Sequence, residues 1–257
     1  MSFKSKLLAG AASLALAGGL AVTGGLGGLS AHAATPSCGP GGIDPVAGPF
    51  GCINVFNRDF GTHRHPNFIM DVFRQGAKVG QPIILFRNSN SDPAEDFTVS
   101  FQGLVSDFYA AGLVSPQVNL HYGGGSLHAK NEPAFELEYS PYGVDSGLCV
   151  GTATTAVQGE GVTLQPCGVT AKTVWILDTF DKSFPAFFTG YFPAINGSDT
   201  NFSHPFVLTY PANGFPTDKP RPQLQTRNLT GFSNGIGRVV GTVIDTQLWG
   251  ANFGVGR

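Results

Sequence analysis

The sequence has few charged side chains and, after its first 33 residues, no long apolar run. Asp, Glu, Lys and Arg make up only 12% of the 257 residues, and the formal net charge is −2. Without a Lys/Arg cluster the protein lacks the positively charged surface that attracts nucleic acids and anionic membranes. No later segment reaches the length of a membrane span. We therefore predict neither a nucleic-acid partner nor a membrane partner.

Several chemical motifs are also missing or incomplete. No C-x-x-C pair suggests a zinc site. His63 and His65 lie two residues apart, but no Cys or clear His partner is near them, so we interpret them as loop residues. Val144–Gly147 (VDSG) resembles half of an aspartic-protease site, whose mechanism needs two such carboxylates. We predict no metal and no cofactor.

Glycine and proline, in contrast, are abundant. The chain has 36 Gly and 18 Pro, which are poor helix formers, together with 21 Phe that can build a core. Short runs such as NFIMDVF, QPIILF, AFELEY and GVTLQPC are separated by turn residues. Many short strands with this punctuation predict an all-β barrel or sandwich, with a helical turn only over Ser106–Ser115.

The first 33 residues have the composition of a targeting segment. A basic start, MSFKSK, precedes an apolar run of small residues and the sequence AHA at Ala31–Ala33. This order predicts a secretory signal peptide over residues 1–33, cleaved near Ala33, and hence a secreted protein. The following residues, 34–50, are a Gly/Pro-rich arm.

All four cysteines lie after the predicted signal peptide. Exported chains usually pair such cysteines, and their order suggests the disulfides Cys38–Cys52 and Cys149–Cys167, each closing a short loop. A metal site is the alternative, and no ligand spacing supports it.

Three segments of the chain repeat one pattern. They cover Asn67–Val99, Gly147–Leu177 and a third stretch that starts at Pro205, and each combines a strand, a turn, an alternating strand and an aromatic-centred strand. The central aromatics are Phe97, Trp175 and Trp249, which are 78 and 74 residues apart. Near-equal spacing of this kind indicates internal repeats.

The second segment, with LCVG, GVTLQPC and TVW, resembles the ricin-type lectin repeat, and TQLW at Thr246–Trp249 resembles the Q-x-W box of that family. The resemblance, which extends to secreted actinobacterial proteins, implies a β-trefoil over residues 51–257. Its repeats would cover about 51–105, 106–182 and 183–257. Extended loops are expected at Ser100–Pro133 and Thr179–Pro205.

In ricin-type lectins an aspartate, an aromatic residue and an asparagine near the Q-x-W box hold a sugar. By position the first repeat keeps Asp71 and Phe86, has Glu95 in place of the glutamine, and offers Asn88 or Asn90 as the amide. The other two repeats have lost these residues, with Gly151 and Gln165 in the second and Thr209 in the third. The resemblance thus implies a ligand site at the first repeat. The alternative is that Asp71 bonds a turn and Phe86 belongs to the core.

Three functions remain open from the sequence. The first is a secreted, non-catalytic module that binds a carbohydrate or polysaccharide through the first repeat. The second is a module that binds an extracellular protein, such as a protease inhibitor acting through its long loops. The third is a glycoside hydrolase, for which Glu136 and Glu138 would share one face of a strand.

Overall fold

The computed structural model describes residues 53–62, 65–89, 92–125, 131–178, 190–212, 214–230 and 242–253, with only the backbone at His65 and Phe253. All of these belong to the unit Ala34–Arg257. The predicted signal peptide, the arm 34–50 and the Cys38–Cys52 pair lie outside the described residues, as do His63 and Asn90. The domain boundaries therefore stay predictions.

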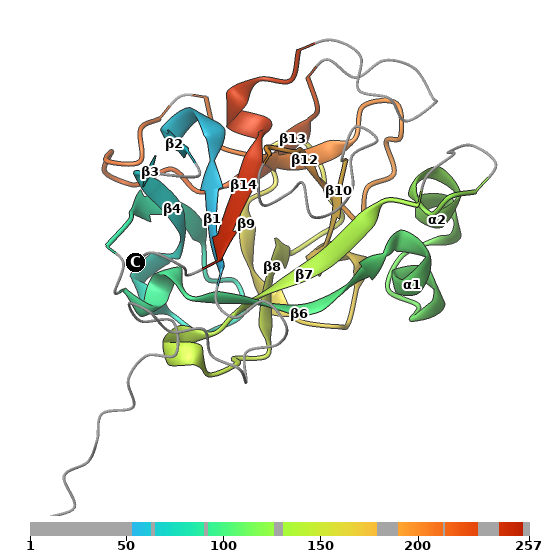
Figure 1. Ribbon diagram of the computed structural model, residues 1–257, viewed down its shortest axis with the longest axis horizontal. Coiled ribbons are helices and arrows are strands. Elements are labelled where there is room, and N and C mark those ends of the chain that lie inside the picture. Colours follow the sequence, from blue (N-terminus) through green and yellow to red (C-terminus); the bar gives the residue numbers. More distant parts are fainter. Residues whose placement is uncertain are drawn as a thin grey trace, which may run out of the picture. The chain divides into compact units, whose positions relative to one another are not determined.

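The main strands form three lobes of four strands each (Figure 1). The first lobe contains β1 (Ile53–Asn57), β4 (Phe68–Val72), β5 (Ile83–Arg87) and β6 (Phe97–Leu104). The second contains β7 (Pro133–Tyr139), β8 (Leu148–Thr152), β9 (Val162–Pro166) and β10 (Val174–Leu177). The third contains β11 (Ala194–Asn196), β12 (Phe206–Thr209), β13 (Gln225–Asn228) and β14 (Trp249–Phe253).

The first and last strand of each lobe build a closed barrel. Antiparallel pairing joins β14 to β1, β1 to β6, β6 to β7, β7 to β10 and β10 to β11. A bridge between Phe192 and Trp249 then connects the β11 side to β14 and completes the ring. A closed ring leaves no exposed sheet edge.

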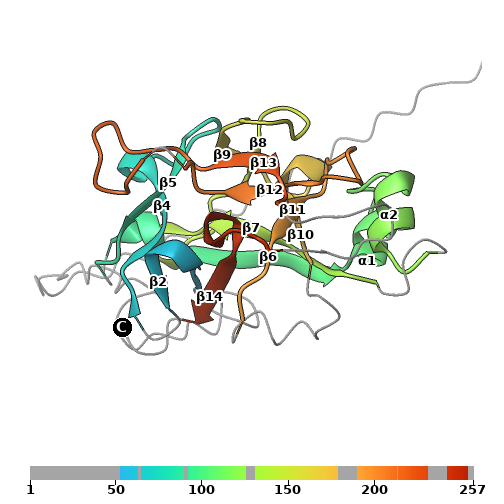
Figure 2. The ribbon, with the colours of Figure 1, turned by 90° about the horizontal axis from the view of Figure 1, so that it is seen from above.

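The two middle strands of each lobe form a hairpin: β4–β5, β8–β9 and β12–β13. Figure 2 shows these hairpin strands above the barrel strands β6, β7 and β14. The bridges Pro82–Thr163, Ile84–Gln223 and Gly161–Gln225 link each hairpin to both others. Six barrel strands capped by three hairpins constitute a β-trefoil, so the predicted fold is confirmed.

The three repeated aromatics meet in one core cluster, as the repeats predict. Phe97, Trp175 and Trp249 are all buried in it. Trp175 Nε1 donates to Val150 O on β8 at 2.8 Å, and Trp249 Nε1 donates to Leu208 O on β12 at 2.8 Å. The two tryptophans thus make equivalent bonds in their own lobes, while Phe97 fills the same place without a donor. The spacing of these aromatics therefore marks the fourth strand of each lobe.

Short elements connect the strands. The 3-10 turns η3 (Pro93–Glu95), η5 (Ala171–Thr173) and η7 (Asp245–Gln247) come just before the last strand of each lobe. The others are η1 (Arg58–Phe60), η2 (Phe73–Gln75), η4 (Pro141–Gly143) and the small hairpin β2 (Gly61–Thr62) and β3 (His65–Pro66).

The segment Ser100–Pro133 is more regular than the long loop that the sequence predicts. It contains the end of β6, helix α1 (Val105–Ala110) and helix α2 (Pro116–Tyr122). Helix α1 confirms the helical turn expected there, but α2 was missed. Phe108 and Val118 anchor the two helices in a second core cluster. Apolar contacts, rather than helix propensity, therefore stabilise these short helices.

Candidate functional site

The hairpin β4–β5 presents Asp71 and Phe86 on the same outward face. Asp71 lies directly opposite Ile84, and Ile69 lies opposite Phe86, so all four side chains share one face. The alternate residues of both strands point the other way and belong to the barrel core: Met70, Val72, Ile83 and Leu85. The alternation therefore excludes Asp71 and Phe86 from the main core and places them side by side.

Asp71 and Phe86 line a cavity of about 260 Å³. Turn η2 supplies Phe73, Arg74 and Gln75, and the approach to η3 supplies Asp92 and Ala94. The remaining wall is formed by Ile84 and by Arg221, which arrives from the loop between β12 and β13. The structure thus brings together two of the five residues that the sequence predicts for a ligand site.

Asp71 is a buried residue whose carboxyl has no hydrogen-bond partner among the described residues. The residue is only 4% exposed, and no described residue donates a hydrogen bond to its carboxylate. The pKa of Asp71 is raised to about 8, mainly by burial and also by the negative charges of Asp92 and Glu95, while the positive charge of Arg221 lowers it. A buried polar group that lacks an internal partner is unusual and marks a candidate binding position.

Arg221 is a charged residue of this site that sequence reasoning missed. Its guanidinium carbon lies 4.2 Å from the centre of the Phe86 ring, in a cation–π contact. Its Nε is buried and has no hydrogen-bond partner among the described residues. Phe86 therefore holds a cationic donor at the cavity, and one face of its ring is already covered.

The rim of the cavity is fixed by short polar contacts. Gln75 Nε2 donates to Asp92 Oδ1 at 2.7 Å, and the same oxygen accepts the Ala94 backbone N–H at 3.0 Å. Arg74 and Gln75 both have positive φ angles, 57° and 56°. Backbone in this region is uncommon for residues other than glycine, and it often occurs at functional sites.

Glu95 and Asn88, which the sequence predicts as ligands, do not line the cavity. Glu95 Oε1 accepts the Ser89 N–H at 2.9 Å, two residues after β5 ends. Gln247 Oε1 accepts the Thr230 N–H at 2.8 Å, two residues after β13 ends. Because Glu95 and Gln247 make the same bond in equivalent positions, Glu95 stabilises the turn that follows β5. Asn88 likewise donates to Pro66 O at 3.1 Å.

The equivalent positions of the other two lobes cannot form the same site. In the second lobe, Gly151 replaces the aspartate, and a Cβ there would lie 2.6 Å from Lys172 O. In the third lobe, Thr209 replaces the aspartate and donates its hydroxyl hydrogen to Val207 O. The strand register places Arg227 at the position that Phe86 occupies in the first lobe. Within the described residues, this combination of carboxyl and aromatic ring therefore occurs only in the first lobe.

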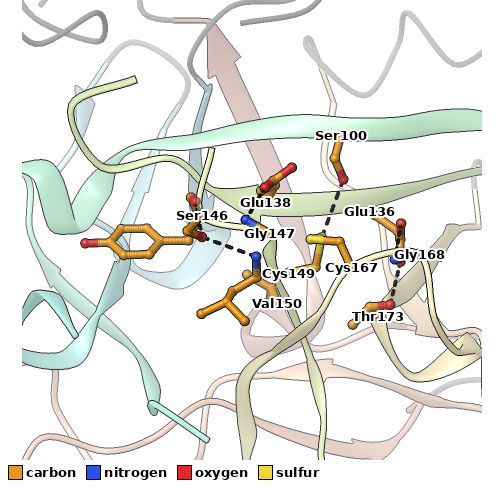
Figure 3. Close-up of a disulfide and its surroundings, with 12 residues drawn as sticks. Ser100, Glu136, Glu138, Ser146, Gly147, Cys149, Val150, Cys167, Gly168 and Thr173 are labelled. Carbon is orange, nitrogen blue, oxygen red and sulfur yellow. Dashed lines mark hydrogen bonds between the residues drawn. A yellow bond between two sulfur atoms is a disulfide. The ribbon is translucent and has the colours of Figure 1, made fainter. Parts of the chain in front are cut away.

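The disulfide predicted between Cys149 and Cys167 is present and joins the ends of β8 and β9 (Figure 3). Glu138 Oε1 accepts the Gly147 N–H at 2.6 Å, and Glu136 accepts the Gly168 N–H at 3.0 Å and the Thr173 hydroxyl. Figure 3 shows both carboxylates beside the disulfide.

Glu136 and Glu138 thus bind the backbone on either side of the disulfide and do not line the cavity at Asp71. A glycoside hydrolase needs two carboxylates aimed into one cleft. These two glutamates have structural partners instead.

Two further observations concern metals and membranes. Among the described residues, no group of three or more His, Cys, Asp or Glu side chains is arranged to hold a metal ion. No helix in the described part of the chain is both long and apolar enough to cross a membrane.

No protein-family model and no curated protein matches the sequence. Among solved structures, the designed threefold-symmetric protein ThreeFoil is 12% identical, with a TM-score of 0.44, over 78% of this chain and 96% of that one. The Rhizoctonia solani agglutinin is 15% identical, with a TM-score of 0.44, over 79% and 94%. The exo-β-1,3-galactanase 1,3Gal43A from Clostridium thermocellum is 9% identical, with a TM-score of 0.44, over 79% and 30%. Likeness at this level carries nothing about ligand or activity.

Proposed function

We propose that this protein is a secreted, non-catalytic carbohydrate-binding module that holds a sugar in the first-lobe cavity. The observation that carries the proposal is the Asp71 carboxyl, which is 4% exposed, lines a cavity and accepts no hydrogen bond from a described residue. Sugar hydroxyls are suitable partners for such a group because one hydroxyl can donate to it while a second accepts from its protonated form.

The surrounding side chains suit a polar ligand of this kind. Arg221 supplies a donor that does not deprotonate, and Phe86 keeps its guanidinium at the cavity. Ile84 and Phe73 offer apolar contact to the C–H groups of a sugar ring. In this arrangement Phe86 acts mainly by positioning Arg221, in contrast to the direct stacking that the lectin resemblance implies.

A glycan array of the protein and three variants tests the proposal. Asp71→Asn removes the titratable carboxyl at almost constant volume, and Phe86→Leu removes the support of Arg221. Gln165→Ala is the matched control because Gln165 occupies the position of Phe86 in the second lobe. We expect the first two variants to lose the glycans that the parent binds and the control to retain them. Glycan binding that survives both substitutions would contradict the assignment.

A further inference from the structure

A second cavity, of about 210 Å³, lies where the turn after β1 meets the loop between β12 and β13. It is distinct from the first-lobe cavity and shares no lining residue with it. The residues that matter for its chemistry are Asp59, Phe60, Tyr210, Phe215, Asp218 and Thr246.

Aromatic rings form the apolar wall of this cavity. The Phe60 ring centre lies 4.6 Å from that of Tyr210 and 5.9 Å from that of Phe215. Phe215 is 63% exposed, although its backbone N–H donates to Asp218 Oδ2 at 2.6 Å and its carbonyl accepts the Asp218 N–H at 2.9 Å. The ring is therefore held by an ordered turn while much of its surface faces solvent.

Two buried hydroxyls in the same wall lack partners. Tyr210 is 1% exposed, and neither its hydroxyl nor the buried Thr246 Oγ1 has a hydrogen bond among the described residues. The pKa of Tyr210 is raised by burial and by the charges of Asp218 and Asp59, so its hydroxyl lies within the field of both carboxylates. Buried hydroxyls are normally satisfied, and the cavity is the side from which a partner can approach.

The charge of the cavity is negative. Asp59 and Asp218 line it, and its lining contains no Lys or Arg. The Asp59 carboxylate and the Oδ1 atom of Asp218 accept no hydrogen bond from a described residue. The nearby Arg58 is turned toward Asp245, with Nε 3.5 Å from Oδ1, and toward the Tyr191 ring. A ligand with a positive charge is therefore favoured over a neutral one.

We propose that this second cavity binds a protonated amino sugar. The ammonium group is placed between Asp59 and Asp218, the C–H face of the sugar ring lies on Phe215, and ring hydroxyls reach Tyr210 and Thr246. A neutral sugar lacks the charge, and a quaternary ammonium ion such as choline lacks the ring and the ring hydroxyls. The inference is independent of the proposed site at Asp71.

Nitrogen-15 NMR titrations at about pH 6, where amines are protonated, test this inference with four probes. Glucosamine carries both the charge and the hydroxyls, glucose and N-acetylglucosamine lack the charge, and choline lacks the ring. We expect saturable shifts near Phe215 and Tyr210 with glucosamine, and binding weaker by about tenfold or more for the other three. Equal affinity for glucose, equal affinity for choline, or no saturable shift with glucosamine would each overturn the proposal.

Two variants locate the binding. Phe215→Ala removes an exposed ring, and Asp218→Asn removes the charge while its side-chain oxygen can still accept the Phe215 N–H. Both should weaken glucosamine binding about tenfold, and Asp71→Asn should leave it unchanged. Shifts that persist in both variants would overturn the assignment. Shifts lost only in Asp71→Asn would place glucosamine in the first-lobe cavity and would also overturn it.

Discussion

Replacing Asp71 by Asn should stabilise the protein at alkaline pH. Asp71 is a buried residue, and its surroundings hold more negative than positive charge. Asparagine has nearly the same shape but does not ionise. The substitution therefore removes the free-energy cost of forming a buried charge, at the expense of the proposed ligand site. Such a trade between stability and function is common at binding sites.

The magnitude follows from the pKa of Asp71, which is 3.8 as an ordinary value and about 8 in the folded protein. Between these two values the folded state binds one more proton than the unfolded state. The free energy of unfolding therefore falls as the pH rises, by about 1.4 kcal/mol per pH unit. Over the whole window the loss reaches roughly 6 kcal/mol, which is comparable with the total stability of many domains.

Urea denaturation of the parent and Asp71→Asn at several pH values measures this effect. The difference in unfolding free energy between them should grow in favour of the variant from about pH 4 to about pH 8 and then level off. Other groups, such as Asp199, contribute to both proteins and cancel in the difference. Gln165→Ala should show no such pH-dependent difference from the parent. A difference that does not change with pH would refute the reasoning.

Three further substitutions test other contacts. Arg221→Met should raise the pKa of Asp71 further, because Arg221 is the charge that lowers it. Carbon-13 NMR titration of the Asp71 carboxyl measures this pKa, and an unchanged midpoint would contradict an interaction between Arg221 and Asp71. The double variant Cys149→Ser/Cys167→Ser should lose about 3 kcal/mol of unfolding free energy, because the disulfide closes a loop with a sequence separation of 18. Urea denaturation measures this loss, and a negligible loss would contradict the value. Trp175→Phe should cost about 1–3 kcal/mol because the indole N–H bond to the β8 carbonyl is lost; an unchanged urea midpoint would show that this bond contributes little.

The fold could be predicted because its signals are local and repeated. Each lobe carries its own alternating hairpin and a large aromatic at the start of its last strand, so Phe97, Trp175 and Trp249 could be aligned without structural information. The pair Cys149 and Cys167 was predictable for the same reason, since both residues lie in one hairpin.

The candidate site was only partly predictable because it also depends on contacts between lobes. Asp71 and Phe86 come from one hairpin, but Arg221 reaches the cavity from the third lobe, and no local pattern indicates that contact. Glu95, which the sequence predicts as a ligand, accepts the Ser89 N–H and does not line the cavity, because a carboxylate that stabilises a turn looks in sequence like one that binds a ligand. The comparison with Gln247 separates the two roles, and it requires the hydrogen bonds of both lobes.

The most direct test of the central claim is chemical-shift mapping with the glycan of highest affinity found on the array. The proposed function predicts that the largest backbone shifts fall on β4, on β5 and around Arg221, and that they disappear in Asp71→Asn. Shifts confined to the second and third lobes, or unchanged in Asp71→Asn, would contradict a sugar site in the first-lobe cavity.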